Sequence, residues 1–297
     1  MRTLCLTLDL LSLPVYGAVH DVPVAGANFS PYDRPLERFL ELAAWLGARV
    51  TFFATGIDLL QSEARKGALD AKEHEFASQG FTHDFLLSTQ SAERIRADLG
   101  ASVEALRDAV GAVPRGFRAP GFVTSGRLLD ELERGGFYWD SSVYPSPLFY
   151  TAKAAMLARY TFQNRAPAPS LGNFRVMRAP REPYRPSTPF LRGTRSLWEL
   201  PVADAWGAPL TGSAIVALSD GRAEPLYRAL QPREHVVLAF HALELADLAE
   251  VPVSVASFHR ELNVPWRKRR KALRRRLELL ADGRTAVTCS ELAARLT

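Results

Sequence analysis

The chain has 297 residues, of which 47% are hydrophobic, and a formal net charge of +5 with an isoelectric point of about 9.4. This size and apolar content suffice for one large core. Two cysteines far apart in apolar stretches exclude a disulfide framework or a CxxC metal site. No run of about 18 apolar residues is present, which excludes a membrane span.

The first segment, MRTLCLTLDLLSLP, superficially resembles a signal peptide. It lacks a small-residue cleavage site, and its apolar run contains Asp9, so residues 3–9 are predicted to form a buried strand instead. With neither a signal peptide nor a transmembrane helix, we expect a cytoplasmic protein, with a peripheral position at a membrane as the alternative.

Short apolar segments alternate with amphipathic ones along the rest of the chain. Residues 35–47 have apolar side chains at helical spacing and stop at a glycine, and residues 91–111 form a long predicted helix that opens with Ser91. Further short strands are predicted at 50–55, 116–120, 138–142, 197–202, 235–241 and 286–289. Alternation of this kind predicts a single-domain α/β fold with a parallel sheet and outer helices.

Two segments are predicted to be irregular. Residues 11–33 are expected to form a long loop after the first strand. Residues 145–195 are rich in proline, arginine and aromatic residues. We expect them to form a long, partly irregular insertion beside the substrate site, within one domain that spans 1–297.

Four candidate catalytic residues each end or follow an apolar strand: Asp9, Arg118, Asp140 and His241. Active sites in parallel α/β folds lie at the carboxyl ends of the strands. A carboxylate can serve as the general base and a histidine as the general acid. Asp9 and His241 are predicted in these roles, with Arg118 holding Asp9 by a two-point hydrogen bond. The alternatives are a structural Asp140 and a His241 that is only packed.

The order of these segments resembles the polysaccharide deacetylase (NodB-homology) family of carbohydrate esterases. Five segments carry the resemblance, in family order: TLDLL at 7–11, QGFTH at 79–83, RAPG at 118–121, DSSVY at 140–144 and AFH at 239–241. The resemblance covers roughly residues 1–145 and 195–297. It implies a distorted (β/α) barrel that hydrolyses N-acetyl or O-acetyl groups.

The chain departs from the family pattern at the metal site. In the family, a second acid after the base binds a divalent metal together with two histidines. Here the acid positions hold Leu10 and Leu11, and Gln79 stands at the first histidine position, so only His83 matches. Gln79 and His83 are therefore weak candidate ligands, and no cofactor is expected. Zinc or another divalent metal would need rearranged ligands, for which the candidates are His20, Asp21, Asp84, Glu244 and Asp247.

Aromatic side chains near the motifs are candidates for binding a glycan or another sugar-containing small molecule. Phe122, Tyr144 and Trp206 would line such a groove, and packing in the core is the alternative for each. The remaining histidines are expected to be surface or structural residues: His74, His235 and His259.

The stretch RKRRKALRRR (267–276) contains eight basic residues in ten. With the leucines that follow, it predicts an outer helix with one apolar face and a solvated cationic remainder. Attraction to anionic lipid at a membrane surface is the functional alternative. Nucleic acid is not expected as a partner, because no nucleic-acid-binding motif accompanies the stretch.

Two functional hypotheses follow from these residues. The first is a deacetylase-like hydrolase of amide bonds in a glycan or lipid-linked sugar that works with little or no metal. The second is a non-catalytic carbohydrate- or lipid-binding pseudoenzyme on the same fold. The presence of Asp9, Arg118 and His241 favours the first, and the missing metal ligands favour the second.

Overall fold

A computed structural model describes residues 1–24, 29–60, 73–162, 170–210, 220–257 and 259–297. Its centre is a curled, parallel, eight-stranded sheet with the strand order β11-β1-β2-β3-β4-β5-β8, and β12 pairs with β1. The strands are β1 (Thr3–Leu10), β2 (Thr51–Ala54), β3 (Glu75–Ser78), β4 (Gly116–Phe117), β5 (Trp139–Asp140), β8 (Trp198–Glu199), β11 (His235–His241) and β12 (Thr285–Ala286).

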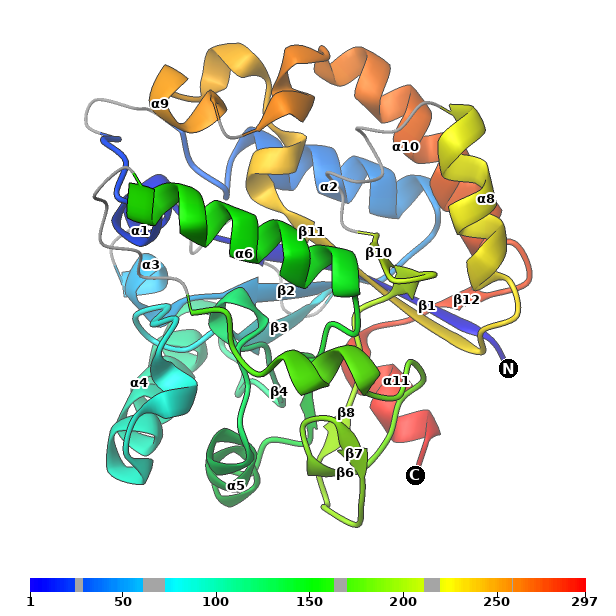
Figure 1. Ribbon diagram of the computed structural model, residues 1–297. Coiled ribbons are helices and arrows are strands. Elements are labelled where there is room, and N and C mark those ends of the chain that lie inside the picture. Colours follow the sequence, from blue (N-terminus) through cyan, green and yellow to red (C-terminus); the bar gives the residue numbers. More distant parts are fainter. Residues whose placement is uncertain (25–28, 61–72, 163–169, 211–219, 258) are drawn as a thin grey trace.

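Helices surround this sheet, and α6 crosses its face near the ends of β1 and β11 (Figure 1). The longer helices are α1 (Leu13–His20), α2 (Arg34–Trp45), α4 (Ala92–Val110), α5 (Gly126–Arg134), α6 (Pro147–Phe162), α8 (Asp220–Leu230), α10 (Trp266–Ala281) and α11 (Cys289–Arg295). Short helices α3 (Gly56–Leu60) and α9 (Val253–Ala256), and two hairpins, β6 (Pro186–Thr188) with β7 (Leu191–Arg192) and β9 (Asp204–Ala205) with β10 (Ala208–Pro209), complete the fold.

The sheet curls far enough to bring its two ends together. After β8 the chain runs on to Val202, which forms a parallel bridge with Val237 of β11. The backbone N–H of Ala203 donates to the carbonyl oxygen of Val237 at 2.9 Å. The predicted distorted (β/α) barrel is therefore confirmed.

Alternation along β1 separates two environments. Leu4, Leu6, Leu8 and Leu10 pack in the core between the sheet and the outer helices. Cys5 lies with Phe53 and Trp139 in a second core cluster, and Asp9, which follows on the same side of the strand, opens onto a cavity. Side chains alternate between the two faces of a strand, so Asp9 and Leu10 must point in opposite directions.

Three elements differ from the sequence expectations. The predicted loop 11–33 contains helix α1, and the predicted irregular insertion 145–195 contains the 16-residue helix α6. Strand β3, which precedes QGFTH, was not predicted. Its four residues EFAS are too short to show a period. Parts of the two predicted irregular segments, 25–28 and 163–169, lie outside the described residues.

None of the helices in the described ranges is long and apolar enough to cross a membrane.

The close approach of Trp139 to Gly116 gives a test of the barrel core. A Cβ atom at residue 116 would lie 1.9 Å from the ring carbon Cζ2 of the fully buried Trp139. Gly116→Ala is therefore expected to lower the free energy of unfolding by about 3 kcal/mol, the upper end of typical overpacking costs. Urea denaturation measures this loss. Gly126→Ala is the matched control, because a Cβ there meets nothing within 4 Å, and an equal loss in both variants would contradict the packing argument.

Candidate active site

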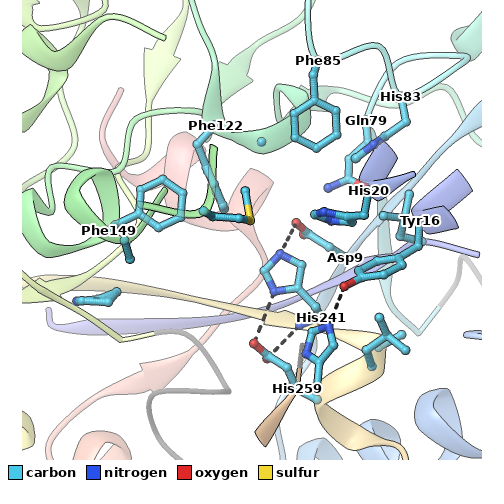
Figure 2. A pocket seen from close by; sticks show the side chains of 18 of the residues that line it. Asp9, Tyr16, His20, Gln79, His83, Phe85, Phe122, Phe149, His241 and His259 are labelled. Atoms are coloured by element: carbon cyan, nitrogen blue, oxygen red, sulfur yellow. Dashed lines mark hydrogen bonds and ion pairs between the residues drawn. The ribbon is translucent and has the colours of Figure 1, made fainter. Parts of the chain in front are cut away.

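The barrel brings the predicted catalytic pair together at one end. β1 and β11 are parallel neighbours, and their register places Asp9 directly beside His241. The two side chains line a cavity of about 520 Å³, and Gln79 and His83 line it as well. Asp9 and His241 lie at the middle of this cavity in Figure 2.

Asp9 is held by a buried arginine through a single hydrogen bond, so the predicted two-point contact is wrong. Nη1 of Arg118 lies 2.6 Å from Oδ1 of Asp9, and the two side chains are 1% and 5% exposed. The same nitrogen donates to Oγ1 of Thr7 at 2.9 Å, while Nε and Nη2 donate to the backbone and side chain of Ser141. The guanidinium also lies 3.9 Å from the ring centre of Phe53. These partners compensate the positive charge of Arg118, which is costly to bury, and hold its guanidinium in one position. The guanidinium in turn keeps the Asp9 carboxylate in place.

His241 lies between two carboxylates. Its Nε2 is 3.7 Å from Oδ2 of Asp9, and its Nδ1 is 3.4 Å from Oε1 of Glu244. Burial alone lowers the pKa of His241, but the hydrogen bond and charge of Glu244 and the charge of Asp9 outweigh it and raise the pKa to about 9. His241 is therefore an imidazolium at neutral pH. Its side chain is 38% exposed, so solvent screens part of these charges.

Glu244 is fixed by Arg269 of the basic helix α10. Arg269 donates to the backbone carbonyl oxygens of Glu244 and Ala246, and to that of Val264 at 2.7 Å. The basic stretch was predicted to be solvated. This is right for four of its side chains, which are exposed: Arg267, Lys268, Lys271 and Arg275. It is wrong for Arg269 and Arg276, which are buried. Arg269 thus positions the turn that follows His241.

Removing Arg269 should destabilise that turn. Arg269→Met is expected to cost about 3 kcal/mol of unfolding free energy, because it leaves the buried carbonyl oxygens of Glu244 and Ala246 and the partly buried one of Val264 without this donor. Chemical denaturation followed by tryptophan fluorescence measures the loss. Lys268→Met, at an exposed position of the same helix, is the control and is expected to stay within about 0.5 kcal/mol of the parent. Equal stability of the two variants would refute the anchoring role.

Gln79 and His83 present polar atoms to the cavity without a partner in the described part of the chain. These atoms are Oε1 of Gln79 and Nδ1 of His83, in side chains that are 2% and 6% exposed. Burial lowers the pKa of His83 to about 4, so its ring is neutral at pH 7. Its backbone φ of 58° is a strained conformation for a residue other than glycine, which is typical of functional sites. Buried polar atoms that lack partners indicate a place for a ligand or for water.

A second polar cluster lines the same cavity, and of its members only His20 was expected near this end of the barrel. Oη of Tyr16 is 3.0 Å from Nε2 of His259, whose Nδ1 is 2.8 Å from Oε1 of Glu261. Nδ1 of His20 is 2.8 Å from Oη of Tyr160. His259, expected to be surface or structural, is thus a cavity residue. Tyr16, Tyr160 and His259 come from segments far apart in sequence and share no motif, so no local signal could have revealed them.

Three of the other predicted site residues, Asp140, Tyr144 and Trp206, lie away from the cavity. Asp140 is fully buried, accepts a hydrogen bond from Ser142 at 2.5 Å, and has its pKa raised to about 6 by burial. Tyr144 is fully buried behind Phe122, and Trp206 is 74% exposed at the β9–β10 turn. The described residues that line the cavity include Phe122 but not Asp140, Tyr144 or Trp206. Their locations favour a structural role for Asp140 and Tyr144 and a surface role for Trp206 over the predicted catalytic and substrate-binding roles.

The residues present do not fit the divalent metal that the family resemblance implies. Leu10 is fully buried in the core, and Leu11 offers only a hydrocarbon side chain to the cavity. One imidazole and one amide remain, whereas catalytic zinc sites use three protein ligands. Among the described residues, no three His, Cys, Asp or Glu side chains are grouped so that they could hold a metal ion. Two proposed replacements are otherwise engaged, since Asp84 accepts from the backbone of Leu86 and His20 pairs with Tyr160.

Comparison with known families agrees with the motifs. Residues 32–138 match the family model described as polysaccharide deacetylase. This range contains QGFTH and RAPG, so the resemblance inferred from the sequence is confirmed. No curated protein matches the chain.

Solved structures share the fold. A protein from Mycobacterium smegmatis that is named as a candidate polysaccharide deacetylase has a TM-score of 0.59 at 19% identity, covering 99% of this chain and 90% of that one. A CE4 family pseudoenzyme from Bacillus anthracis has a TM-score of 0.50 at 10% identity, covering 99% and 66%. A mutant described as a CE4 family pseudoenzyme with restored enzymatic activity has a TM-score of 0.50 at 11% identity, covering 99% and 68%. At these identities the likeness shows the fold alone.

Proposed function

We propose that the protein is a deacetylase-like hydrolase of amide bonds in a glycan or lipid-linked sugar, and that it works without a metal ion. The observation that carries the proposal is the contact of Asp9 with His241 in the cavity, 3.7 Å apart, each held by a second charged side chain. The match to the polysaccharide deacetylase model supports a glycan substrate.

Asp9 and His241 have complementary roles in this reaction. Oδ1 of Asp9 is engaged by Arg118, and Oδ2 faces His241, so Oδ2 can take a proton from water. The water oxygen then bonds to the carbonyl carbon and forms a tetrahedral intermediate. As the carbon–nitrogen bond breaks, the protonated His241 gives its proton to the leaving nitrogen. The proton on Asp9 returns to His241 or to solvent.

Gln79 and His83 can stabilise the oxyanion of that intermediate. A glutamine amide carries two N–H donors and can rotate, and a neutral imidazole carries one. Both side chains line the cavity and have atoms without partners in the described part of the protein. Donors aimed at a developing oxyanion typically contribute about 10²–10³-fold in rate each. The two residues at the family's metal positions would thus act by hydrogen bonding.

Release of free amine from N-acetylated glucosamine oligomers tests this proposal. The protein is dialysed against EDTA and assayed before and after zinc is added. We expect the same activity in both arms. Activity that appears only with zinc would contradict the metal-independent mechanism, and no amine release in either arm would contradict hydrolysis of N-acetyl groups.

A non-catalytic carbohydrate- or lipid-binding protein is the second candidate. The loss of the metal ligands at Leu10, Leu11 and Gln79 favours it, and the fold likeness to a CE4 family pseudoenzyme supports it. Saturable binding of the same oligomers without amine release would establish this function over the first.

The exposed basic residues of α10 support a further part of the proposal. Arg267, Lys268, Lys271 and Arg275 point to solvent on one helix. Anionic lipid head groups attract such residues by about 1 kcal/mol each. We therefore propose a peripheral position at the cytoplasmic face of a membrane.

A further inference from the structure

The cavity has an apolar half next to the catalytic pair. Its apolar lining includes Leu11, Phe85, Phe122, Phe149, Met156 and Leu243. Figure 2 shows Phe122 and Phe149 on one side of Asp9 and His241, with Tyr16, His20 and His259 on the other. The volume of about 520 Å³ lies within the range of small-molecule pockets, about 300–1,000 Å³.

Helix α6 forms one wall of this apolar half. Phe149, Ala152, Met156 and Tyr160 recur at helical spacing and all line the cavity. Two hydrogen bonds of 2.8 Å hold the helix in place, from Nζ of Lys153 to the carbonyl oxygen of Gly121 and between Tyr160 and His20. The helix therefore makes a pocket at the strand ends, next to Asp9 and His241.

We propose that this half of the cavity binds the acyl group of an N-acyl substrate, and that this acyl group is longer than acetyl. The inference rests on the proposed function, because it places the scissile carbonyl beside Asp9 and His241. An acetyl methyl group would leave most of the apolar wall without contacts, whereas a chain of six to eight carbons or an aromatic acyl group would cover it. The amine part of the substrate then faces the hydroxyl and imidazole groups of Tyr16, His20 and His259.

Titration of an acyl-chain series tests the proposal. The probes are N-acetyl-, N-butanoyl-, N-hexanoyl- and N-octanoyl-glucosamine, and the protein is the His241→Gln variant, so that the ligands stay intact. This position is 38% exposed, so the substitution is compatible with folding. We expect the dissociation constant to fall about fourfold per added methylene until the pocket is full, equivalent to about 0.8 kcal/mol each. A dissociation constant that is unchanged from acetyl to hexanoyl would overturn the proposal.

Substitutions in α6 provide the matched variants. Ala152→Trp adds bulk to the pocket and Met156→Asp places a charge in it, so each is expected to weaken octanoyl binding at least tenfold and to weaken acetyl binding less. Ala154→Trp is the control, because Ala154 is exposed on the same helix and is not among the described residues that line the cavity. If Ala152→Trp and Ala154→Trp bind the octanoyl probe alike, the assignment of this wall is wrong. Thermal melts confirm that each variant is folded.

The same series separates this inference from the proposed hydrolase. Chain-length-dependent binding without release of acid by the parent protein would support the acyl pocket and reject the hydrolase. Hydrolysis of the acetyl probe combined with flat binding would support the hydrolase and reject the acyl pocket.

Discussion

Replacing His241 by glutamine is expected to lower kcat for amide hydrolysis by about 10²–10⁴-fold, the usual contribution of a general acid. Glutamine can accept or donate a hydrogen bond but cannot supply a proton to the leaving nitrogen. Asp9→Asn should lower kcat by a similar factor because it removes the proposed general base. Steady-state amine release measures both losses.

The two variants should differ in stability. Asp9→Asn removes the charge that compensates the buried guanidinium of Arg118, so it is expected to lower the unfolding free energy as well. His241→Gln should lower stability less than Asp9→Asn does, because the imidazolium that it removes is 38% exposed and solvent screens part of its attraction to Asp9 and Glu244. His235→Gln is the control, since His235 lies at the opposite end of β11 and bonds to Thr3. Full activity in His241→Gln would show that this residue is not the proton donor.

The pH dependence follows from the raised pKa of His241, about 9. In the proposed mechanism its protonated form is the active one, so kcat/KM should fall as pH rises through about 9, and this fall should be absent in His241→Gln. The stabilising contacts of the imidazolium are fully present below the ordinary pKa of about 6.5. Their contribution to stability is lost as pH rises from there through the folded-state value.

Rebuilding the family's ligand set should create zinc binding when the acid is placed at residue 11 but not when it is placed at residue 10. In the double variant Leu11→Asp with Gln79→His, the new carboxylate and the new imidazole line the cavity together with His83. The three side chains complete a set of three protein ligands. The metal-free variant should be less stable than the parent, because a carboxylate replaces an apolar side chain. Zinc at 100 times its dissociation constant should restore about 2.7 kcal/mol, since it binds the folded state alone. Melts with and without zinc measure the change.

Leu10→Asp with Gln79→His is the matched control. Leu10 is fully buried among the outer core residues, on the opposite face of β1 from Asp9. We expect this variant to be strongly destabilised and unresponsive to zinc. If the Leu11 variant also fails to respond, Gln79, His83 and residue 11 do not converge closely enough to hold a metal.

The sequence by itself determined a parallel α/β sheet, the barrel that the family resemblance implied, and the meeting of Asp9 and His241 at one end of it. Apolar runs such as 3–9 and 235–241 bury strands by local hydrophobicity, and polar residues at their ends meet at one edge because parallel strands share a direction. Asp9, Arg118 and His241 could be placed in this way. The departures at Leu10, Leu11 and Gln79 could also be read directly, since they concern residue identity rather than position.

Only the tertiary structure decided what surrounds that pair. Tyr16, His20, Tyr160 and His259 reach the cavity from α1, α6 and the segment after α9, and contacts between distant segments leave no periodic trace in the sequence. The burial of Arg269 could not be predicted from the sequence either, because the residue stands in a charged run. It is buried because its guanidinium donates to three backbone carbonyl oxygens. The structure also decided that the Leu10 side chain points into the core and the Leu11 side chain towards the cavity, because this depends on where strand β1 ends. The lining of the pocket, and with it the proposed acyl group, therefore follows from packing rather than from any motif.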